Sequence, residues 1–255
     1  MENPNQEMKQ VMKYISLIIS VLLISMIPIS CSTHEEVPVR SQTIQFSYRI
    51  EPTTDARSSE KNYFYDGDII YLAATFALTG GNEYQEFKVA KVNNGLITTT
   101  MEWPQNATTG NFIAWFADNS DPNDNGILTI NLHNDILKAV ALVNNPNDII
   151  PLNFQHSLMR IVITGIEKDE TITVSSTSGT DGVISFNTDL SIGHPLICSE
   201  NGISITLTPD DNSFYLQNWT QPLILQSNKV TSPKTIPCPE SPAAIGKSYV
   251  ILFRQ

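Results

Sequence analysis

The chain has 255 residues and a formal net charge of -11, with 15 Lys and Arg against 26 Asp and Glu. Charged residues make up 16% of the sequence and hydrophobic residues 41%, a composition that excludes a wholly disordered protein. No cluster of Lys and Arg occurs, which argues against nucleic acid as a partner because the phosphate backbone requires basic side chains. The length fits one large domain or two small ones.

The first thirty residues have the pattern of an export signal. An uncharged apolar run spans residues 14–29, Lys9 and Lys13 precede it, and a serine and Cys31 follow it. The run is shorter than the roughly 20 residues of a membrane-spanning helix, and Pro28 lies near its end. A basic start, a short apolar core and a small residue before the cleavage point are typical of a secretory signal.

Cys31 directly after the small residue predicts a lipoprotein, in which this cysteine is acylated and becomes the new N-terminus. Residues 1–30 are then removed, and residues 31–42 form a polar tether to the outer membrane at the cell surface. The alternative is an ordinary signal peptide with a chance cysteine, since Pro28 stands where lipoproteins usually carry Leu. Met12 is an alternative start of the chain.

Two further cysteines, Cys198 and Cys238, remain in the mature chain. An exported compartment permits a disulfide between them. The alternative is two separate buried thiols. Because no CxxC motif and no histidine pair accompany them, they do not predict a zinc site.

Beyond the tether the sequence has the pattern of short β-strands. Residues 44–50 alternate apolar and polar side chains, as a half-buried strand does. Further strand-like segments lie at 69–76, 87–92, 96–101, 111–117, 127–131, 150–166, 171–175, 182–186, 203–208, 214–217, 223–226 and 248–253. Residues 53–61 between the first two strands are polar and lack periodicity, so we expect an exposed loop there.

Many short strands at spacings near ten residues predict an all-β fold with one or two β-sandwiches. We expect one helix only, at residues 135–140, with Asn134 or Asp135 as its cap. A charged turn near residues 165–169 suggests a domain boundary. The two predicted domains are therefore residues 43–167 and 168–255.

No motif in the sequence specifies catalysis, a metal or a cofactor. Residues 121–126 (DPNDNG) resemble the start of a calcium loop, but Leu132 stands where such a loop needs a bidentate Glu. An Asn- and Asp-rich turn explains this segment. The histidines are scattered, and His156 in its β-rich segment is expected to be a structural core residue, hydrogen-bonded to the backbone. Nucleophile-elbow and nucleotide-binding glycine motifs do not occur.

Two sets of residues leave a sugar-related function open. One consists of two carboxylate pairs in turn sequence, and the other of the three tryptophans. These residues are Asp66, Asp68, Asp210, Asp211, Trp103, Trp115 and Trp219. Carboxylates in turns usually cap backbone groups, whereas a glycosidase pairs carboxylates from separate elements. The strand context of Trp103 and Trp115 favours a place in the core over a sugar platform.

Five features follow one another in an order and spacing that is typical of one protein family. They are 66–70 (DGDII), 101–104 (MEWP) with 112–116 (FIAWF), 135–139 (DILKA), 154–163 (FQHSLMRIVI) and 246–249 (GKSY). The best match is 154–163, which is similar to the family's F-x-H-x-L strand. Together these segments resemble the fimbrillin family, the lipoprotein subunits and associated proteins of type V fimbriae. The resemblance covers about residues 43–253.

This resemblance implies two tandem β-sandwich domains of transthyretin-like, Greek-key type and a structural or adhesive role without catalysis. It implies that a surface protease cuts the exported lipoprotein after an Arg. The matching residue is Arg57, which follows the first strand, whereas Arg40 precedes it. The cut releases the first strand, and a neighbour's C-terminal strand fills the groove. The implied partners are other fimbrial subunits, the outer membrane and a host or bacterial surface ligand.

The end of the sequence departs from the family pattern. Fimbrial stalk subunits continue past the G-K-x-Y strand into a terminal donor strand, whereas this sequence stops at Gln255. A subunit that accepts a strand without donating one is expected at a fimbrial tip or as a stand-alone surface protein. The alternative functions are a carbohydrate-binding lipoprotein that does not polymerise and a β-sandwich hydrolase.

Overall fold

β-Strands are the only regular elements in the part of the chain that the structure describes, which confirms the all-β class. This computed structural model describes residues 40–52, 61–117, 127–130, 132–144, 149–176, 183–187, 196–199, 202–241 and 243–254. All of them belong to one unit of the chain, Pro38–Gln255. Within these ranges, no helix has the length and hydrophobicity needed to span a bilayer.

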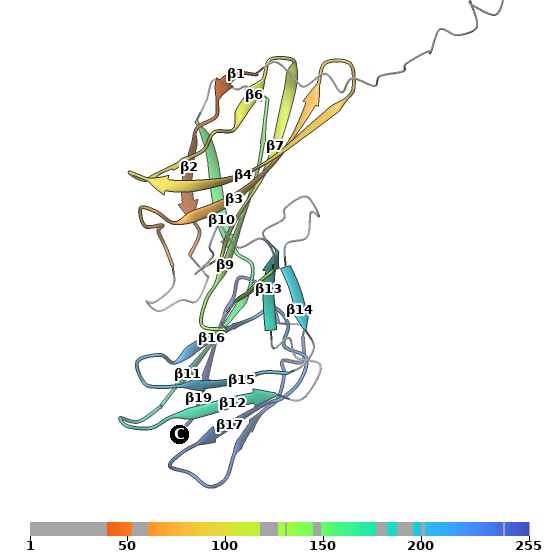
Figure 1. The fold of residues 1–255 in the computed structure, drawn as a ribbon. Helices are drawn as coiled ribbons and strands as arrows, with labels where there is room; N and C mark the ends of the chain where they lie inside the picture. Colours follow the sequence, from red (N-terminus) through yellow and green to blue (C-terminus); the bar gives the residue numbers. More distant parts are fainter. Residues whose placement is uncertain are drawn as a thin grey trace, which may run out of the picture. The chain divides into compact units, whose positions relative to one another are not determined.

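Seven strands form a closed barrel in the order β10-β2-β5-β4-β3-β7-β9 (Figure 1). Their bounds are β2 Phe46–Ile50, β3 Ile69–Leu78, β4 Glu83–Asn93, β5 Leu96–Thr98, β7 Ala107–Ala117, β9 Ile136–Val143 and β10 Ile150–His156. Neighbouring strands are antiparallel, except that β2 and β10 are parallel. The turn between β4 and β5 places Asn94 and Gly95 at φ angles of 50° and 74°, as an Asn-Gly hairpin turn requires.

Aromatic side chains fill much of the barrel. Successive residues of a strand point to opposite faces, and in β10 every second side chain is buried. The ring of Phe112 lies edge to face against Phe46 at 5.4 Å and against Phe76 at 5.6 Å between centroids. This geometry is the one that aromatic pairs prefer, so the core holds its wall strands in a defined register.

The remaining strands form four smaller sheets. β11 (Met159–Thr164) lies between β16 (Ser213–Leu216) and β19 (Ser248–Leu252), antiparallel to β16 and parallel to β19. The other orders are β15-β12-β17-β18, β14-β13-β8 and β1-β6. Their bounds are β1 Arg40–Thr43, β6 Glu102–Pro104, β8 Ile127–Ile130, β12 Ile172–Ser176, β13 Val183–Asn187, β14 Leu196–Ser199, β15 Ser204–Leu207, β17 Leu223–Ser227 and β18 Lys234–Ile236. Side chains of β11, β12, β15, β16, β17 and β19 share one buried apolar cluster.

The helix expected at residues 135–140 is wrong, because this segment forms β9. The strand pairs with β7 along its whole length and with the end of β10. Ile136 and Leu137 are both buried, so both faces of the first half of β9 are covered. A strand buried on both faces lacks the apolar-polar alternation that identifies a half-exposed strand, and its apolar spacing imitates a helix.

Strand pairing also divides the segment 150–166 in a way that the sequence does not predict. A bend at residues 157–158 separates β10, which belongs to the barrel, from β11, which pairs with β16 and β19. A closed barrel stands where the sequence predicts the N-terminal sandwich. The division into domains 43–167 and 168–255 stays a prediction.

Candidate strand-exchange site

β2 is the strand that the sequence analysis expects to be released by a cut at Arg57. It lies between β10 and β5 in the barrel (Figure 1). It runs parallel to β10, with Phe46 opposite Ile150 and Ile50 opposite Phe154. It is antiparallel to β5, where the paired residue is again Phe46. β2 is therefore a wall strand of the barrel, with a hydrogen-bonded neighbouring strand on each side.

Backbone hydrogen bonds extend this pairing beyond both ends of β2. The N–H of Ile44 donates to the C=O of Met101 at 3.0 Å. At the other end, the N–H of Glu51 donates to the C=O of Phe154 at 2.9 Å. The hydrogen-bonded segment is thus longer than the strand itself.

The inward side chains of β2, together with that of Ile44 two residues before the strand, form part of the barrel core. Ile44, Phe46 and Ile50 are buried, and Tyr48 is half-buried. Phe46 packs on Phe112 as described above. Because these residues alternate along the segment, they form one continuous apolar face that fills the space between β10 and β5.

Tyr48 makes the most specific contact of this face. Its hydroxyl donates to the backbone C=O of Phe64 at 3.2 Å, and the two rings lie 4.8 Å apart between centroids. Phe64 is itself buried, and its ring lies 5.0 Å from those of Phe116 and Phe154. The carbonyl that receives the Tyr48 hydroxyl is therefore held in place by the barrel core.

Removal of β2 leaves two kinds of unsatisfied surface. Backbone groups of β10 and β5 lose their hydrogen-bond partners, and each such buried group costs about 1–3 kcal/mol. The apolar side chains around Phe112 and Phe64 lose the rings that cover them. Together these losses favour capture of another extended segment in the same place.

The residues singled out from the sequence for processing lie largely outside this geometry. Cys31 and Arg57 fall outside the described residues, so lipidation and cleavage stay predictions. Arg40, the competing basic residue, opens β1, which pairs with β6. The backbone of Cys198 lies in β14, but its side chain is not among those described. Cys238 is half-buried, and its disulfide with Cys198 stays a prediction.

His156 is buried, as the sequence predicts, but its partner is a carboxylate. Its Nδ1 contacts Oδ2 of Asp135, which is also buried. The other oxygen of Asp135 accepts a hydrogen bond from the N–H of Ile136 at 2.7 Å. The pair joins the end of β10 to the start of β9. The sequence does not reveal this pair, because residues 135–140 predict a helix with Asn134 or Asp135 as its cap.

Asp66 and Asp68 have the capping role that the sequence favours, whereas the Asp211 side chain contacts His133 at 3.0 Å. Asp66 accepts a hydrogen bond from the N–H of Asn94 at 2.9 Å. Asp68 accepts one from the N–H of Tyr65 at 2.9 Å and pairs with Lys61 at 2.8 Å. All three tryptophans, Trp103, Trp115 and Trp219, are buried, so the sugar platform weighed from the sequence is wrong. Across the described ranges no three potential metal-ligating side chains come together, and the calcium-like segment 121–126 lies outside those ranges.

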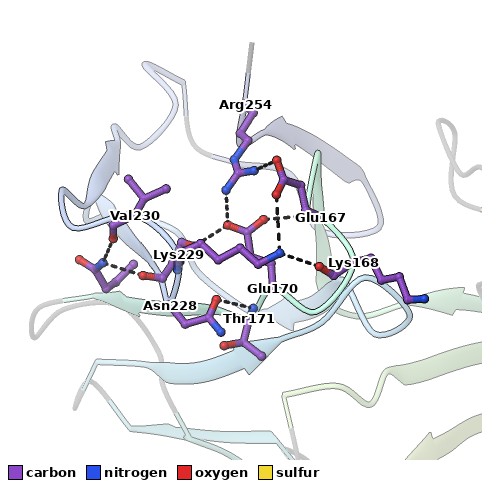
Figure 2. A network of polar contacts seen from close by, with 10 residues as sticks. Glu167, Lys168, Glu170, Thr171, Asn228, Lys229, Val230 and Arg254 are labelled. Atoms are coloured by element: carbon purple, nitrogen blue, oxygen red, sulfur yellow. Dashed lines mark hydrogen bonds and ion pairs between the residues drawn. The ribbon is translucent and has the colours of Figure 1, made fainter.

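A second polar cluster surrounds Glu170, whose side chain is buried (Figure 2). Oε1 of Glu170 accepts hydrogen bonds from the Ser227 hydroxyl and from Nη2 of Arg254, the latter at 2.5 Å. Its Oε2 accepts one from the backbone N–H of Glu167 at 2.8 Å. Arg254 and Lys229 each form an ion pair with the Glu167 side chain as well. The network links four separate positions around one carboxylate.

The environment of Glu170 acts on its pKa in two directions. Burial raises the pKa, whereas the hydrogen bonds from Ser227 and from the N–H of Glu167 lower it. The charges of Arg254 and Lys229 lower it further, and the net result is a pKa below the usual value. The ionised carboxylate is therefore the form that the folded protein stabilises.

The chain at the end of β19 is held by Arg254 in the Glu170 cluster and by further hydrogen bonds nearby. Nζ of Lys234 donates to the carbonyls of Leu252 and Phe253 at 2.8 and 2.9 Å, and the N–H of Phe253 donates to Thr164 at 2.8 Å. The sequence signals only a charged turn here, because the partners of Glu170 lie 57 and 84 residues further along the chain.

Comparison with protein-family models and with curated proteins finds no match. The fold is similar to that of a candidate cell adhesion protein from Bacteroides ovatus, with a TM-score of 0.53 at 14% identity, over 84% of this chain and 93% of that one. A fimbrial assembly protein from Parabacteroides distasonis gives a TM-score of 0.43 at 14% identity, over 82% and 90%. A fimbrial protein from Bacteroides ovatus gives 0.45 at 14% identity, over 84% and 49%. The first alignment shows a shared fold, and the name of that structure is consistent with the fimbrillin-like family that the sequence resembles.

Proposed function

We propose that this chain is a lipid-anchored component of type V fimbriae at the cell surface, with a structural or adhesive role and no catalysis. Cleavage after Arg57 releases β2 from the barrel, and a strand from a neighbouring subunit replaces it. The observation that carries this proposal is the position of β2. This strand lies in the barrel wall between β10 and β5, and the segment with Arg57 follows it directly in the sequence.

The organisation into two tandem β-sandwich domains belongs to the same proposal. The buried apolar cluster of the barrel is separate from the cluster formed by β11, β12 and β15 to β17 with β19. In this proposal each of the two clusters is the core of one domain, while a third cluster combines Tyr71 and Trp115 of the barrel with Tyr215 of β16. Acylation of Cys31 then anchors the first unit to the outer membrane through the tether at residues 31–42.

One observation favours the alternative of a carbohydrate-binding protein that does not polymerise. Tyr63 and Tyr65 are 51% and 59% exposed, with ring centroids 4.7 Å apart and hydroxyls joined at 2.7 Å. Exposed rings with polar tips are suited to contact a ligand that has apolar faces and hydroxyl groups. Glycan binding by the intact monomer, without any strand uptake, is the result that separates this alternative from the proposal.

N-terminal sequencing of protein extracted from the cell surface tests the proposal. We expect a mature form that begins at Ser58, because an Arg-specific cut after Arg57 leaves this residue first. Arg57→Ala should abolish that form, whereas Arg40→Ala is the matched control and should leave it unchanged. A native start at Cys31 or Ser41 contradicts the proposal, because β2 then stays covalently attached to the barrel.

A further inference from the structure

We propose that the barrel selects its incoming strand by a tyrosine, and that it rejects β19 of a second copy of this chain. The inference rests on the proposed function, since it concerns the groove that β2 leaves. The side chains that β2 and the residues flanking it place in that groove define what a replacement must supply. Four alternating positions carry this information, those of Ile44, Phe46, Tyr48 and Ile50.

The position of Phe46 requires a large ring. This side chain is completely buried, and its edge-to-face contact with Phe112 closes the core on that side. A small residue there leaves a cavity in the barrel, and a charged residue is buried without a partner. Ile44 and Ile50 are also buried, so aliphatic side chains suit the two ends.

The position of Tyr48 requires a ring with a donor at its far end. The neighbouring group is Phe64, whose ring stacks at a tilt on the incoming ring and whose carbonyl accepts the hydroxyl at 3.2 Å. The contacts of Phe64 with Phe116 and Phe154 fix that carbonyl. Tyrosine satisfies both features at once. Phenylalanine fills the same space without donating the hydrogen bond.

The groove also fixes the direction of the incoming strand, and it tolerates different side chains on the face of that strand that points to solvent. A replacement has to run parallel to β10 to reproduce the pairing of Phe46 with Ile150 and of Ile50 with Phe154. Arg49 is exposed, so its position places little demand on the side chain. The expected donor strand therefore carries an aliphatic residue, an aromatic residue, a tyrosine and an aliphatic residue, in this order, at every second position.

β19 of this chain does not meet that pattern. If Tyr249 takes the tyrosine position, Lys247 falls at the completely buried position of Phe46. If Phe253 takes it, the hydroxyl is lost and Gln255 falls at the position of Ile50. The Glu170 cluster and Lys234 additionally hold the residues after β19 in place (Figure 2). The groove therefore does not suit β19 of a second copy as the incoming strand.

Peptide exchange into the cut barrel tests the inference. The segment 54–59 of the full chain is replaced by the recognition sequence of a specific protease, so that β2 stays in its groove until a competitor displaces it. The probe is a fluorescent peptide with the sequence of residues 42–52 (QTIQFSYRIEP). Its uptake by the cut protein, and not by the uncut protein, is the reference measurement.

Variant peptides then report on each position. Tyr48→Phe should weaken binding about three- to tenfold, the effect of one hydrogen bond. Phe46→Ala should weaken it by more than about a hundredfold, because a cavity opens in the core. Arg49→Ala is the matched control and should stay within about twofold. A peptide of residues 245–255 should not displace the probe.

Each contrary outcome refutes one named part of the inference. Equal affinity of the Tyr48→Phe and unmodified peptides refutes selection by tyrosine, while uptake of the unmodified peptide leaves strand exchange intact. Displacement of the probe by the peptide of residues 245–255 refutes the rejection of β19. If the cut barrel takes up none of the peptides, strand exchange itself is refuted, and the inference with it.

Discussion

The contact between His156 and Asp135 joins two barrel strands through a buried pair of titratable side chains. We expect His156→Ala to lower the free energy of unfolding by about 3–5 kcal/mol, because the carboxylate stays buried without its imidazole partner. His133→Ala is the matched control, since His133 meets Asp211 at 3.0 Å on a more exposed part of the chain. It should cost less than about 1 kcal/mol. Urea unfolding measures both, and equal losses contradict the structural role of His156.

Glu170 makes the free energy of unfolding depend on pH, and its lowered pKa means that stability falls on acidification. The folded pKa lies below the usual value of 4.5, so the stabilisation by this carboxylate is present above that pH and is lost as the pH falls through the lowered folded pKa. Glu170→Gln should destabilise the protein at neutral pH and flatten the loss of stability on acidification. Glu167→Gln should have a smaller effect, because the Glu167 side chain is 57% exposed. Denaturant midpoints between neutral and acidic pH measure the difference, and unchanged pH dependence in Glu170→Gln is the contrary result.

At the scale of elements, Gly110 allows β7 to pass closely over aromatic rings. A Cβ atom at this position would lie 2.8 Å from a ring carbon of Phe112 and 2.9 Å from one of Trp103. We expect Gly110→Ala to destabilise the barrel by about 1–3 kcal/mol, as overpacking of a core does. Asn111→Ala, at the exposed neighbouring position of the same strand, should change stability by less than about 0.5 kcal/mol. Thermal unfolding compares the two variants, and similar midpoints contradict the close approach.

Elements that depend on local pattern could be predicted from the sequence. The strand at residues 44–50 alternates regularly, and the Asn94-Gly95 turn carries its own hairpin signal. β9 could not be recognised, because burial on both faces removes the alternation. The parallel pairing of β2 with β10 brings together residues that are far apart in the sequence, and no local pattern encodes such a partner.

The candidate site divides in the same way. Its strand β2 could be identified from the sequence, because the strand has a local period. The role of Arg57 stays a prediction that the family resemblance implies. The partner of the Tyr48 hydroxyl could not, since a backbone carbonyl, that of Phe64, leaves no trace in the residue type. The burial of Glu170 could not be predicted for a related reason, because a Glu in a polar turn is usually a solvent-exposed surface residue.

At the scale of the whole molecule, the lipid anchor and the exchanged strand lie on the same side of the proposed cut. Cys31 and β2 both precede Arg57 in the sequence. A fully extended tether of residues 31–42 reaches about 40 Å at most, so the proposed acylation of Cys31 would keep the barrel near the membrane. After the proposed cleavage, the barrel is connected to the lipid by the non-covalent contacts of β2 and by the pairing of β1 with β6. Strand exchange should therefore release the barrel from its own anchor at the moment that it joins a neighbour.

Acyl labelling of cells that carry the protein tests this coupling. We expect denatured, Arg57-cleaved protein to show the label only on the fragment 31–57, and the label to stay with the barrel under native conditions until a donor strand is added. Cys31→Ala should remove the label altogether and leave the precursor unprocessed or released, because no other cysteine lies at a signal cleavage point. Cys198→Ala is the control and should be labelled normally. A label on the fragment after Arg57, or an unchanged label in Cys31→Ala, is incompatible with this arrangement, because either places the lipid on a part of the chain that strand exchange does not remove.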